Sequence, residues 1–364
     1  MSEKASDTAV DEDQSNADGR RARGEFVRGV SGFRATLGDP EFPPEPARYH
    51  LYVALNCPWC HRVTLARAIL GLSETLSMDV VFPVRTEEDD PAGENLWQFA
   101  PDKIASLTGE TLPECTPETG SGADHRLVRD IYAAERSDER SVPVLYDTRR
   151  KRIVSNESAD IIRMLNAHAD ALGSTIAPGR RIDLYPPEDD LRAEIDRLNA
   201  SIYQAINNGA YKAGFSADQA VYEQAYSAYF ALLGDLEERL ASDGRPFLTG
   251  DRFTEADLRL FPTLYRHDPV YYLRMKLNGA KILDFPSLWR WLCRVHALPG
   301  VAESSSLTHC RQGYFGRSWN KVVPLGPFVP MTYPEAYAHP ELARSRSFNH
   351  ARRSGNESAG TVSA

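Results

Sequence analysis

Two cysteines in a C-x-x-C arrangement carry the most specific chemistry in this sequence. The segment 56–61 (NCPWCH) lies between a predicted strand and a predicted helix. Pro58 suits the first position of a helix, because its φ is fixed and that position needs no N–H donor. Cys57 then becomes the N-cap, where unpaired backbone N–H groups and the helix dipole favour the thiolate. We therefore predict that Cys57 is a nucleophile and that Cys60, one turn into the helix, is a candidate resolving thiol.

Three other interpretations of this motif are open. The two cysteines could be buried structural residues. A zinc site would need about two more ligands at metal spacing, whereas Cys115, Cys293 and Cys310 are isolated in the sequence. The run 57–61 also matches the C-x-x-C-H signature of haem attachment, which normally implies an exported protein. We expect no metal site, and the strand–cysteine–helix context favours thiol transfer or redox chemistry.

The elements around the motif predict a thioredoxin-like domain. Alternating apolar residues over 48–55 predict a strand, and the helix that follows is closed by Gly71. The resulting order is β-α-β followed by β-β-α. The expected strands are 48–55, 76–84, 141–147 and 152–154, and the expected helices are 61–70, 124–134 and 157–169.

A proline and a helix start in this half are candidate parts of a ligand site. Pro143 begins the third strand, where a thioredoxin-like fold is expected to hold it cis and to leave the backbone of Val142 free for a peptide-like ligand. The alternative is an ordinary edge-strand proline. The helix starting near Glu157 has free N–H groups for a carboxylate, and Glu157 could accept from an ammonium group. The alternative there is a capped helix without a ligand.

The second half of the chain changes to helical patterns alone. A Pro- and Gly-rich stretch at 172–187 marks the boundary, and Thr254 with Asp257 forms a capping-box pattern at one helix start. The expected helices are 188–206, 217–241, 255–266 and 286–297. The expected organisation is a disordered segment 1–24, a thioredoxin-like domain 25–172, an all-helical domain 185–330 and a flexible tail 331–364. Six tyrosines are candidates for an aromatic pocket, although each one singly is more often a packing residue: Tyr203, Tyr211, Tyr265, Tyr271, Tyr272 and Tyr314.

The composition of the chain indicates which classes of partner and which compartment to expect. The chain has 364 residues, with 42 Lys and Arg against 51 Asp and Glu, a net charge of −9. Such a balance gives no general attraction to nucleic acid or to an anionic membrane. No apolar run approaches the roughly 18 residues of a membrane helix. Five cysteines, an odd number, without an apolar leader predict a cytoplasmic protein with reduced thiols.

Several stretches in the right order resemble the glutathionyl-hydroquinone reductases, the Xi-class glutathione transferases. They include EFVRGVSGFR, RYHLYVALNCPWCHR, VPVLYD, IVSNESADIIRML, NNGAYKAGF and LTGDRFTEADLRLF. The resemblance runs from about Gly24 to Pro327. It implies an α/β thioredoxin-like N-terminal domain followed by an all-α glutathione-transferase C-terminal domain, typically in a homodimer. It also implies glutathione as co-substrate and an aromatic glutathionyl-hydroquinone as substrate.

The resemblance also implies roles for single residues. Cys57 is the implied nucleophile. The implied glutathione-binding residues are Trp97, Arg129, Val142, Glu157 and Ser158, and the implied quinol-pocket residues are Tyr211, Tyr271 and Tyr314. This chain departs from the family pattern at Asn56, Cys60, Leu96 and Phe315, where the family commonly has Ala, Ala, Gly and Tyr.

We therefore expect an enzyme that uses a Cys57–glutathione mixed disulfide to reduce glutathionyl-hydroquinones. The alternatives are a glutaredoxin-like dithiol oxidoreductase that uses Cys57 and Cys60, or a non-catalytic binding scaffold.

Overall fold

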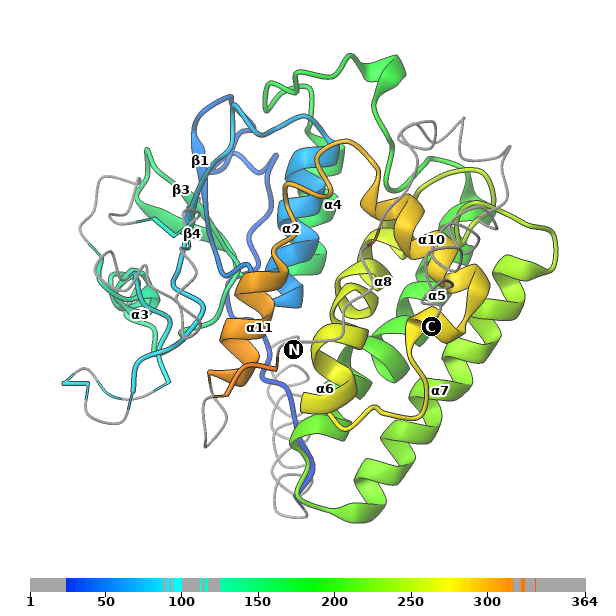
Figure 1. Ribbon diagram of the computed structural model, residues 1–364. Helices are drawn as coiled ribbons and strands as arrows, with labels where there is room; N and C mark the ends of the chain where they lie inside the picture. Colours follow the sequence, from blue (N-terminus) through cyan, green and yellow to red (C-terminus); the bar gives the residue numbers. More distant parts are fainter. Residues whose placement is uncertain are drawn as a thin grey trace, which may run out of the picture.

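The computed structural model describes residues 24–87, 90–91, 93, 95–99, 112, 115–116, 125–316, 322–324 and 331. The expected disordered segment and the expected flexible tail lie outside these residues, except for Gly24 and Met331. The described part forms a small sheet with its helices and a second, helical region beside it (Figure 1). Within it, no helix is both long enough and apolar enough to cross a bilayer.

The sheet has four strands and confirms the predicted order. They are β1 (Tyr49–Val53), β2 (Ser77–Val80), β3 (Val144–Asp147) and β4 (Arg152–Ser155). Their order in the sheet is β2-β1-β3-β4, with β1 parallel to β2 and antiparallel to β3, and β3 antiparallel to β4. All five residues of the central strand β1 are buried, so both of its faces contribute to the core.

Three helices accompany the sheet: α2 (Pro58–Ile69), α3 (Val128–Ala133) and α4 (Ser158–Ala167). In Figure 1, α2 and α4 lie between the sheet and the helical region, and α3 lies on the other side of the sheet. Cys57 is the N-cap of α2 with Pro58 at its first position, as predicted. Gly71 follows the helix end with φ +70°, a conformation that suits glycine. Both ends of the helix that carries the reactive motif are therefore defined by local sequence.

The helical region contains three α-helices that were not predicted, α6, α9 and α11. Its helices are α5 (Asp189–Ser201), α6 (Asn208–Phe215), α7 (Gln219–Ala241), α8 (Glu255–Arg266), α9 (Tyr272–Arg274), α10 (Pro286–His296) and α11 (Leu307–Phe315). Two π-helical segments, Ile202–Asn207 and His267–Tyr271, follow α5 and α8, and two short 3₁₀ turns occupy Pro178–Arg180 and Ile282–Asp284. The helix predicted over 188–206 is confirmed in extent, but its last part is π-helical rather than α-helical. The capping box of α8 is confirmed, because the N–H of Thr254 donates to the Asp257 carboxylate at 3.1 Å.

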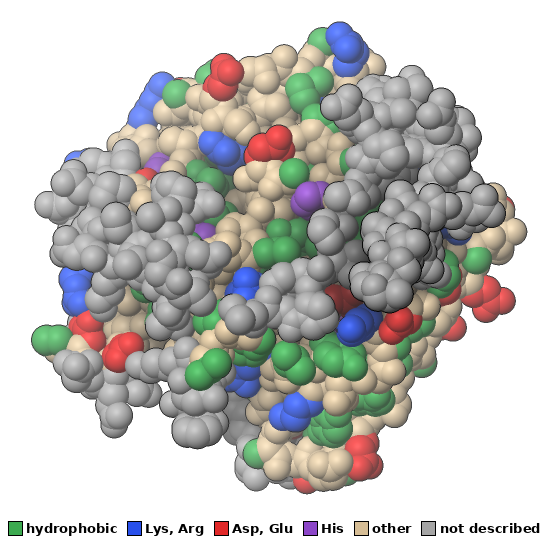
Figure 2. All heavy atoms as spheres, viewed as in Figure 1, with side chains coloured by type: hydrophobic (Ala, Val, Ile, Leu, Met, Phe, Trp, Pro, Cys, Tyr) green, Lys and Arg blue, Asp and Glu red, His purple; other side chains and the backbone are tan. Residues whose placement is uncertain are grey.

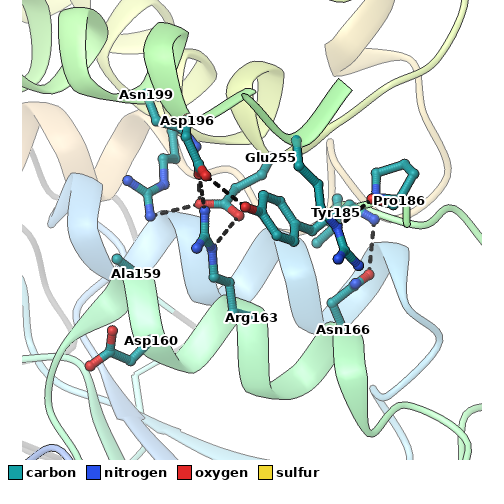
Figure 3. Close-up of polar contacts among 12 residues, drawn as sticks. Ala159, Asp160, Arg163, Asn166, Tyr185, Pro186, Asp196, Asn199 and Glu255 are labelled. Carbon is teal, nitrogen blue, oxygen red and sulfur yellow. Dashed lines mark hydrogen bonds and ion pairs between the residues drawn. The ribbon is translucent and has the colours of Figure 1, made fainter. Parts of the chain in front are cut away.

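A buried carboxylate joins the two regions (Figure 3). Glu255 at the start of α8 is 1% exposed and accepts from Arg163 of α4 at 2.8 Å. Arg259 and Asn199 also bond Glu255, at 2.7 and 3.1 Å. The guanidinium of Arg163 continues to Asp196 of α5. Helix α4 of the sheet domain is thereby tied to two helices of the second region.

Candidate active site

The C-x-x-C motif opens on a cavity of about 560 Å³ that is lined by both regions of the fold. The lining comes from the N-terminal segment, the start of α2 and the turn before it, the segment that follows β2, the loop before β3, the residues between β4 and α4, and helices α6 and α11. The lining residues are Arg28, Gly29, Val30, Ser31, Asn56, Cys57, Trp59, Arg85, Asn95, Trp97, Glu139, Arg140, Ser141, Val142, Asn156, Tyr211, Phe215, Gly313 and Tyr314. Five of the predicted site residues therefore share one cavity: Cys57, Trp97, Val142, Tyr211 and Tyr314.

Cys57 is held as a thiolate by its surroundings. Its backbone is extended, with φ −81° and ψ 123°, so its side chain faces the unpaired N–H groups of the first turn of α2. Burial by itself raises the pKa of the thiol. Hydrogen bonds from the side chain and backbone of Cys60 and the positive charge of Arg28 outweigh burial and lower the Cys57 pKa to about 6. At neutral pH the sulfur is therefore mostly ionised and nucleophilic.

Cys60 lies behind Cys57 and keeps its proton. Its side chain is completely buried, and its sulfur accepts from the N–H of Ala54 at 3.3 Å. Burial and then the hydrogen bond to Cys57 hold the pKa of Cys60 well above its usual range. The two sulfurs thus share one proton, which resides on Cys60. Among the described residues, no group of three or more His, Cys, Asp or Glu side chains is placed to hold a metal ion.

The peptide bond between Val142 and Pro143 is cis, as predicted. The sulfur of Cys57 lies 3.9 Å from the carbonyl oxygen of Val142, so this backbone faces the thiol across the cavity. Trp97 forms another part of the wall, and the guanidinium carbon of Arg85 lies 4.0 Å from the centre of its ring.

Glu157, Ser158 and Arg129 lie outside the cavity lining. Glu157 caps α4 by accepting from the N–H of Ala159 at 3.0 Å, and it also accepts from the Ser31 hydroxyl at 3.2 Å. The hydroxyl of Ser158 is 3.4 Å from the same carboxylate. Arg129 is 43% exposed and lies 3.9 Å from Asp130. The predicted start of α4 thus adjoins the cavity through Asn156, whereas Arg129 does not line the cavity.

The three predicted tyrosines form one hydrogen-bonded cluster. The hydroxyl of Tyr314 from α11 contacts the hydroxyl of Tyr211 from α6 at 2.5 Å and that of Tyr271 at 3.0 Å. Tyr271 is fully buried behind the cavity wall. Burial raises the pKa of all three phenols, so they are protonated donors at neutral pH.

His61, the histidine of the C-x-x-C-H match, has a structural role. Arg266 of α8 donates to its Nδ1 at 2.9 Å, and Ser305 contacts its Nε2 at 2.9 Å. Burial and then the charge of Arg266 hold the pKa of His61 well below its usual range, so the ring is neutral. Arg266 also donates to the carbonyl oxygens of Leu55 and Asn56, at 2.9 and 3.2 Å. Both nitrogens of the ring are thus engaged in the domain interface, which leaves none for a haem iron.

Sequence reasoning missed two arginines of the site, Arg28 and Arg266. Arg28 reaches the cavity from the N-terminal segment, and its guanidinium carbon lies 3.7 Å from the centre of the Trp59 ring. The stretch EFVRGVSGFR contains Arg28, but no local pattern in it indicates contact with a helix thirty residues later. Arg266 sits at the end of a well-predicted helix, where burial of a charge has no signal in sequence.

Comparison with known proteins places this site in a family. The glutathione S-transferase N-terminal domain matches residues 56–168, and the glutathione S-transferase C-terminal domain matches residues 219–294. The chain is 40% identical over 321 residues to the glutathionyl-hydroquinone reductase PcpF of Sphingobium chlorophenolicum, covering 86% of this chain and 93% of that protein. This chain belongs to the glutathionyl-hydroquinone reductases.

Solved structures of Xi-class glutathione transferases agree with this membership. The Xi transferase of Phanerochaete chrysosporium superposes with a TM-score of 0.73 at 34% identity, covering 85% of this chain and 99% of that one. The glutathione-bound structure of YqjG from Escherichia coli K-12 gives a TM-score of 0.72 at 36% identity, covering 86% and 98%. The predicted fold class is confirmed: a thioredoxin-like domain precedes a helical glutathione-transferase domain in this reductase family.

Proposed function

We propose that this enzyme reduces glutathionyl-hydroquinones to hydroquinones, with glutathione as the reductant and Cys57 as the nucleophile. One observation carries the proposal. A thiol with a pKa of about 6 opens on a cavity whose other wall holds the hydroxyls of Tyr211 and Tyr314. The relatives named glutathionyl-hydroquinone reductase support the same substrate class.

In the first step the Cys57 thiolate attacks the sulfur that joins glutathione to the aromatic ring. A sulfur–sulfur bond forms, the carbon–sulfur bond breaks, and the electron pair passes to the ring carbon. That carbon takes a proton, which a phenol of the tyrosine cluster can supply because burial keeps the phenols protonated. The hydroquinone leaves, and Cys57 remains as a mixed disulfide with glutathione.

In the second step a glutathione thiolate attacks the glutathione sulfur of the mixed disulfide. The bond between Cys57 and glutathione breaks, glutathione disulfide is released and the Cys57 thiolate is restored. The proton lost by the attacking glutathione replaces the one that the phenol gave to the ring carbon. The low pKa of Cys57 favours this step as well, because a weakly basic thiolate is a good leaving group. The net reaction consumes one glutathione per hydroquinone released and needs no further oxidant or reductant.

Glutathione should bind along the cavity wall next to Cys57. We expect the backbone of Val142 to pair with the peptide, and Trp97 to lie against it, since both line the cavity. Glu157 and Ser158 at the start of α4 would take the zwitterionic end, whereas Arg129, which is also expected to hold glutathione, does not line the cavity. Binding at Glu157 requires the Ser31 hydroxyl to share this carboxylate with the ligand ammonium.

A dithiol reaction is the second candidate, because Cys60 is hydrogen-bonded to Cys57. Cys60 would attack the mixed disulfide and release glutathione with an internal disulfide. Incubation with glutathione disulfide and intact mass measurement tests the two routes. One added glutathione supports the monothiol route, and an internal disulfide supports the dithiol route. The absence of both products would refute a reactive Cys57.

The reaction class is tested by a paired assay on one protein batch. Release of hydroquinone from a glutathionyl-hydroquinone should far exceed conjugation of glutathione to chlorodinitrobenzene. A cysteine facing the glutathione sulfur forms a disulfide with it, whereas conjugation needs that sulfur as a free thiolate. Strong conjugation with negligible hydroquinone release would place the protein among the ordinary transferases.

We also propose a cytoplasmic homodimer. Reduced thiols suit that compartment, since all five cysteines are free. Figure 2 shows hydrophobic side chains gathered in the lower half of the face drawn there. Leu273, 55% exposed, is a large apolar side chain available for a contact between copies. Light scattering of the purified protein gives the mass that decides between monomer and dimer.

A further inference from the structure

The N-terminal segment 24–34 is a strap that crosses from one domain to the other over the cavity. On the helical side, Ala217 donates to the carbonyl of Gly24 at 2.9 Å, and Glu25 pairs with Lys212 at 2.9 Å. The ring of Phe26 lies 5.8 Å from that of Tyr211. The strap is therefore anchored beside the tyrosine cluster.

The other end of the strap is bound to the start of α4. Phe33 donates its N–H to Asn156 at 3.2 Å, and Arg34 pairs with Asp160 at 2.7 Å. Between these anchors, Val30 is 80% exposed. Ser31 and Gly32 also donate to Glu157 and Glu139, at 3.2 and 3.0 Å. Arg28 lies between the two anchored ends and lines the cavity.

Arg28 carries a charge that no described carboxylate neutralises. Its guanidinium lies over Trp59, two residues after Cys57, and none of the described carboxylates forms an ion pair with it. Trp59 is also contacted by Arg62, whose guanidinium carbon is 4.4 Å from the ring centre and whose Nη2 donates to Asn207. The indole is thereby fixed as a platform for Arg28.

The other groups near Cys57 do not supply this charge. The groups that face it from the packed elements are Cys60 of α2, Arg266 of α8, Tyr211 of α6, and Cys310 and Tyr314 of α11. The thiols and phenols among them are neutral. Arg266 donates its hydrogen bonds to backbone carbonyls and to His61.

Three further charged residues line the same cavity. Arg85 lies over Trp97. Glu139 is held by the N–H of Gly32 and by Asn156, and Arg140 follows it in the chain.

We propose that Arg28 is the positioning residue that holds the Cys57 thiolate, and that the strap 24–34 delivers it across the domain boundary. This proposal rests on the proposed role of Cys57 as nucleophile. A cation beside the sulfur stabilises the thiolate before it attacks and again when it leaves the mixed disulfide. The positive charge would also draw an anionic thiol peptide toward the sulfur.

The test is the pH dependence of Cys57 alkylation by iodoacetamide, followed by peptide mass mapping. This reagent is uncharged, so removal of a cation does not alter its encounter with the protein. In Arg28→Gln the midpoint of alkylation should rise by about one pH unit, the lower end of the effect of a neighbouring charge. Arg28→Lys keeps the charge, so its alkylation midpoint should stay close to that of the wild type.

Two further variants separate the charge of Arg28 from general damage. Arg252→Gln removes an arginine that pairs with Glu188 away from both the strap and the cavity, and it should leave the midpoint unchanged. Phe26→Ala loosens the anchor without touching Arg28 and should raise the midpoint, because the strap no longer holds the cation in place. A midpoint in Arg28→Gln within about 0.2 units of wild type would overturn the proposal, as would an equal rise in Arg252→Gln.

Alkylation involves no hydroquinone, so this result is independent of the proposed reductase activity. A wild-type enzyme without hydroquinone release but with the Arg28 shift would refute the reaction and leave the role of Arg28 standing. The reverse result would refute the role of Arg28 alone.

Discussion

The hydroxyl oxygens of Tyr211 and Tyr314 lie 2.5 Å apart, although the two residues are 103 positions apart in the chain. Tyr314 sits on α11, the last described helix, and Tyr211 on α6. Tyr271 adds a third hydroxyl at 3.0 Å from that of Tyr314. A proton given up by one phenol can therefore be replaced by its neighbour, which suits a step that delivers a proton to a ring carbon.

Tyr314→Phe should lower kcat for hydroquinone release by at least about tenfold, since a positioned general acid contributes roughly 10²–10⁴-fold. The KM should change little, because the ring remains in the wall. Steady-state kinetics measures both constants. Tyr203→Phe, a change in a tyrosine that packs near Trp59 but lies outside the cavity lining, is the control and should keep kcat. Equal losses in the two variants would mean that the cluster only packs the wall.

Cys60→Ala should raise the alkylation midpoint of Cys57 above about 6, because the hydrogen bond from Cys60 helps to lower this pKa. Reductase activity should therefore fall near pH 6 and recover near pH 9, where the thiolate forms without help. Cys293→Ala, in the buried face of α10, is the matched control. Accumulation of glutathionylated Cys57 at every pH would instead support a resolving role for Cys60.

The Cys57 thiolate should make stability depend on pH. Its folded pKa of about 6 lies below the value of about 8.5 in an unfolded chain, so the folded state binds fewer protons between them. The stabilisation is fully present above the unfolded pKa and is lost as the pH falls through 6. Urea unfolding of wild type and Cys57→Ser should thus show a difference that grows from pH 6 to pH 9. A constant difference would contradict a depressed pKa.

Glu157→Gln should weaken glutathione binding by roughly 10- to 150-fold if the carboxylate receives the ligand ammonium, since such charge-assisted bonds are worth about 1.5–3 kcal/mol. The fold should persist, because a glutamine oxygen can still accept from the N–H of Ala159. Isothermal titration with glutathione measures the loss. Asp160→Asn, on the same turn but paired with Arg34, should bind normally. Unchanged binding in Glu157→Gln would reduce that residue to a helix cap.

Arg163→Ala should lower the free energy of unfolding by about 3 kcal/mol, because it leaves the buried carboxylate of Glu255 without one of its cations. Arg34→Ala breaks an exposed pair with Asp160 and should cost at most about 1 kcal/mol. Urea titrations of both variants test the contrast. Similar losses in both would show that Arg259 and Asn199 suffice to hold Glu255.

Local patterns predicted the parts of the site that depend on local physics. The N-cap position of Cys57 follows from the proline after it, and the capping box at Thr254 follows from an acid three residues on. The cis bond at Pro143 required knowledge of the fold, since proline at a strand start is otherwise ambiguous. The first two features are encoded within a few residues of the chain, and the structure confirms all three.

Features that depend on distant contacts were missed. Helix α11 has nine residues and a buried Gly313 packed against Asn56 of the β1–α2 turn, so tertiary packing rather than local propensity stabilises it. The π-helical segment Ile202–Asn207 is tied to a distant helix, because the side-chain amide of Asn207 donates to the hydroxyl of Thr263 in α8. Arg28 and Arg266 act across domains, and single-chain periodicity carries no information about such partners.

The bonds from Arg266 to Leu55, Asn56 and His61 limit how this enzyme can be recombined. A chimera that joined its sheet domain to the helical domain of a different transferase would inherit two buried carbonyls and a buried imidazole in need of a donor. Unless the new α8 carried an arginine at the matching place, the turn that aims the reactive sulfur would lose its support. The two domains look separable along the chain, but the turn before α2 and the end of α8 must therefore change together in evolution.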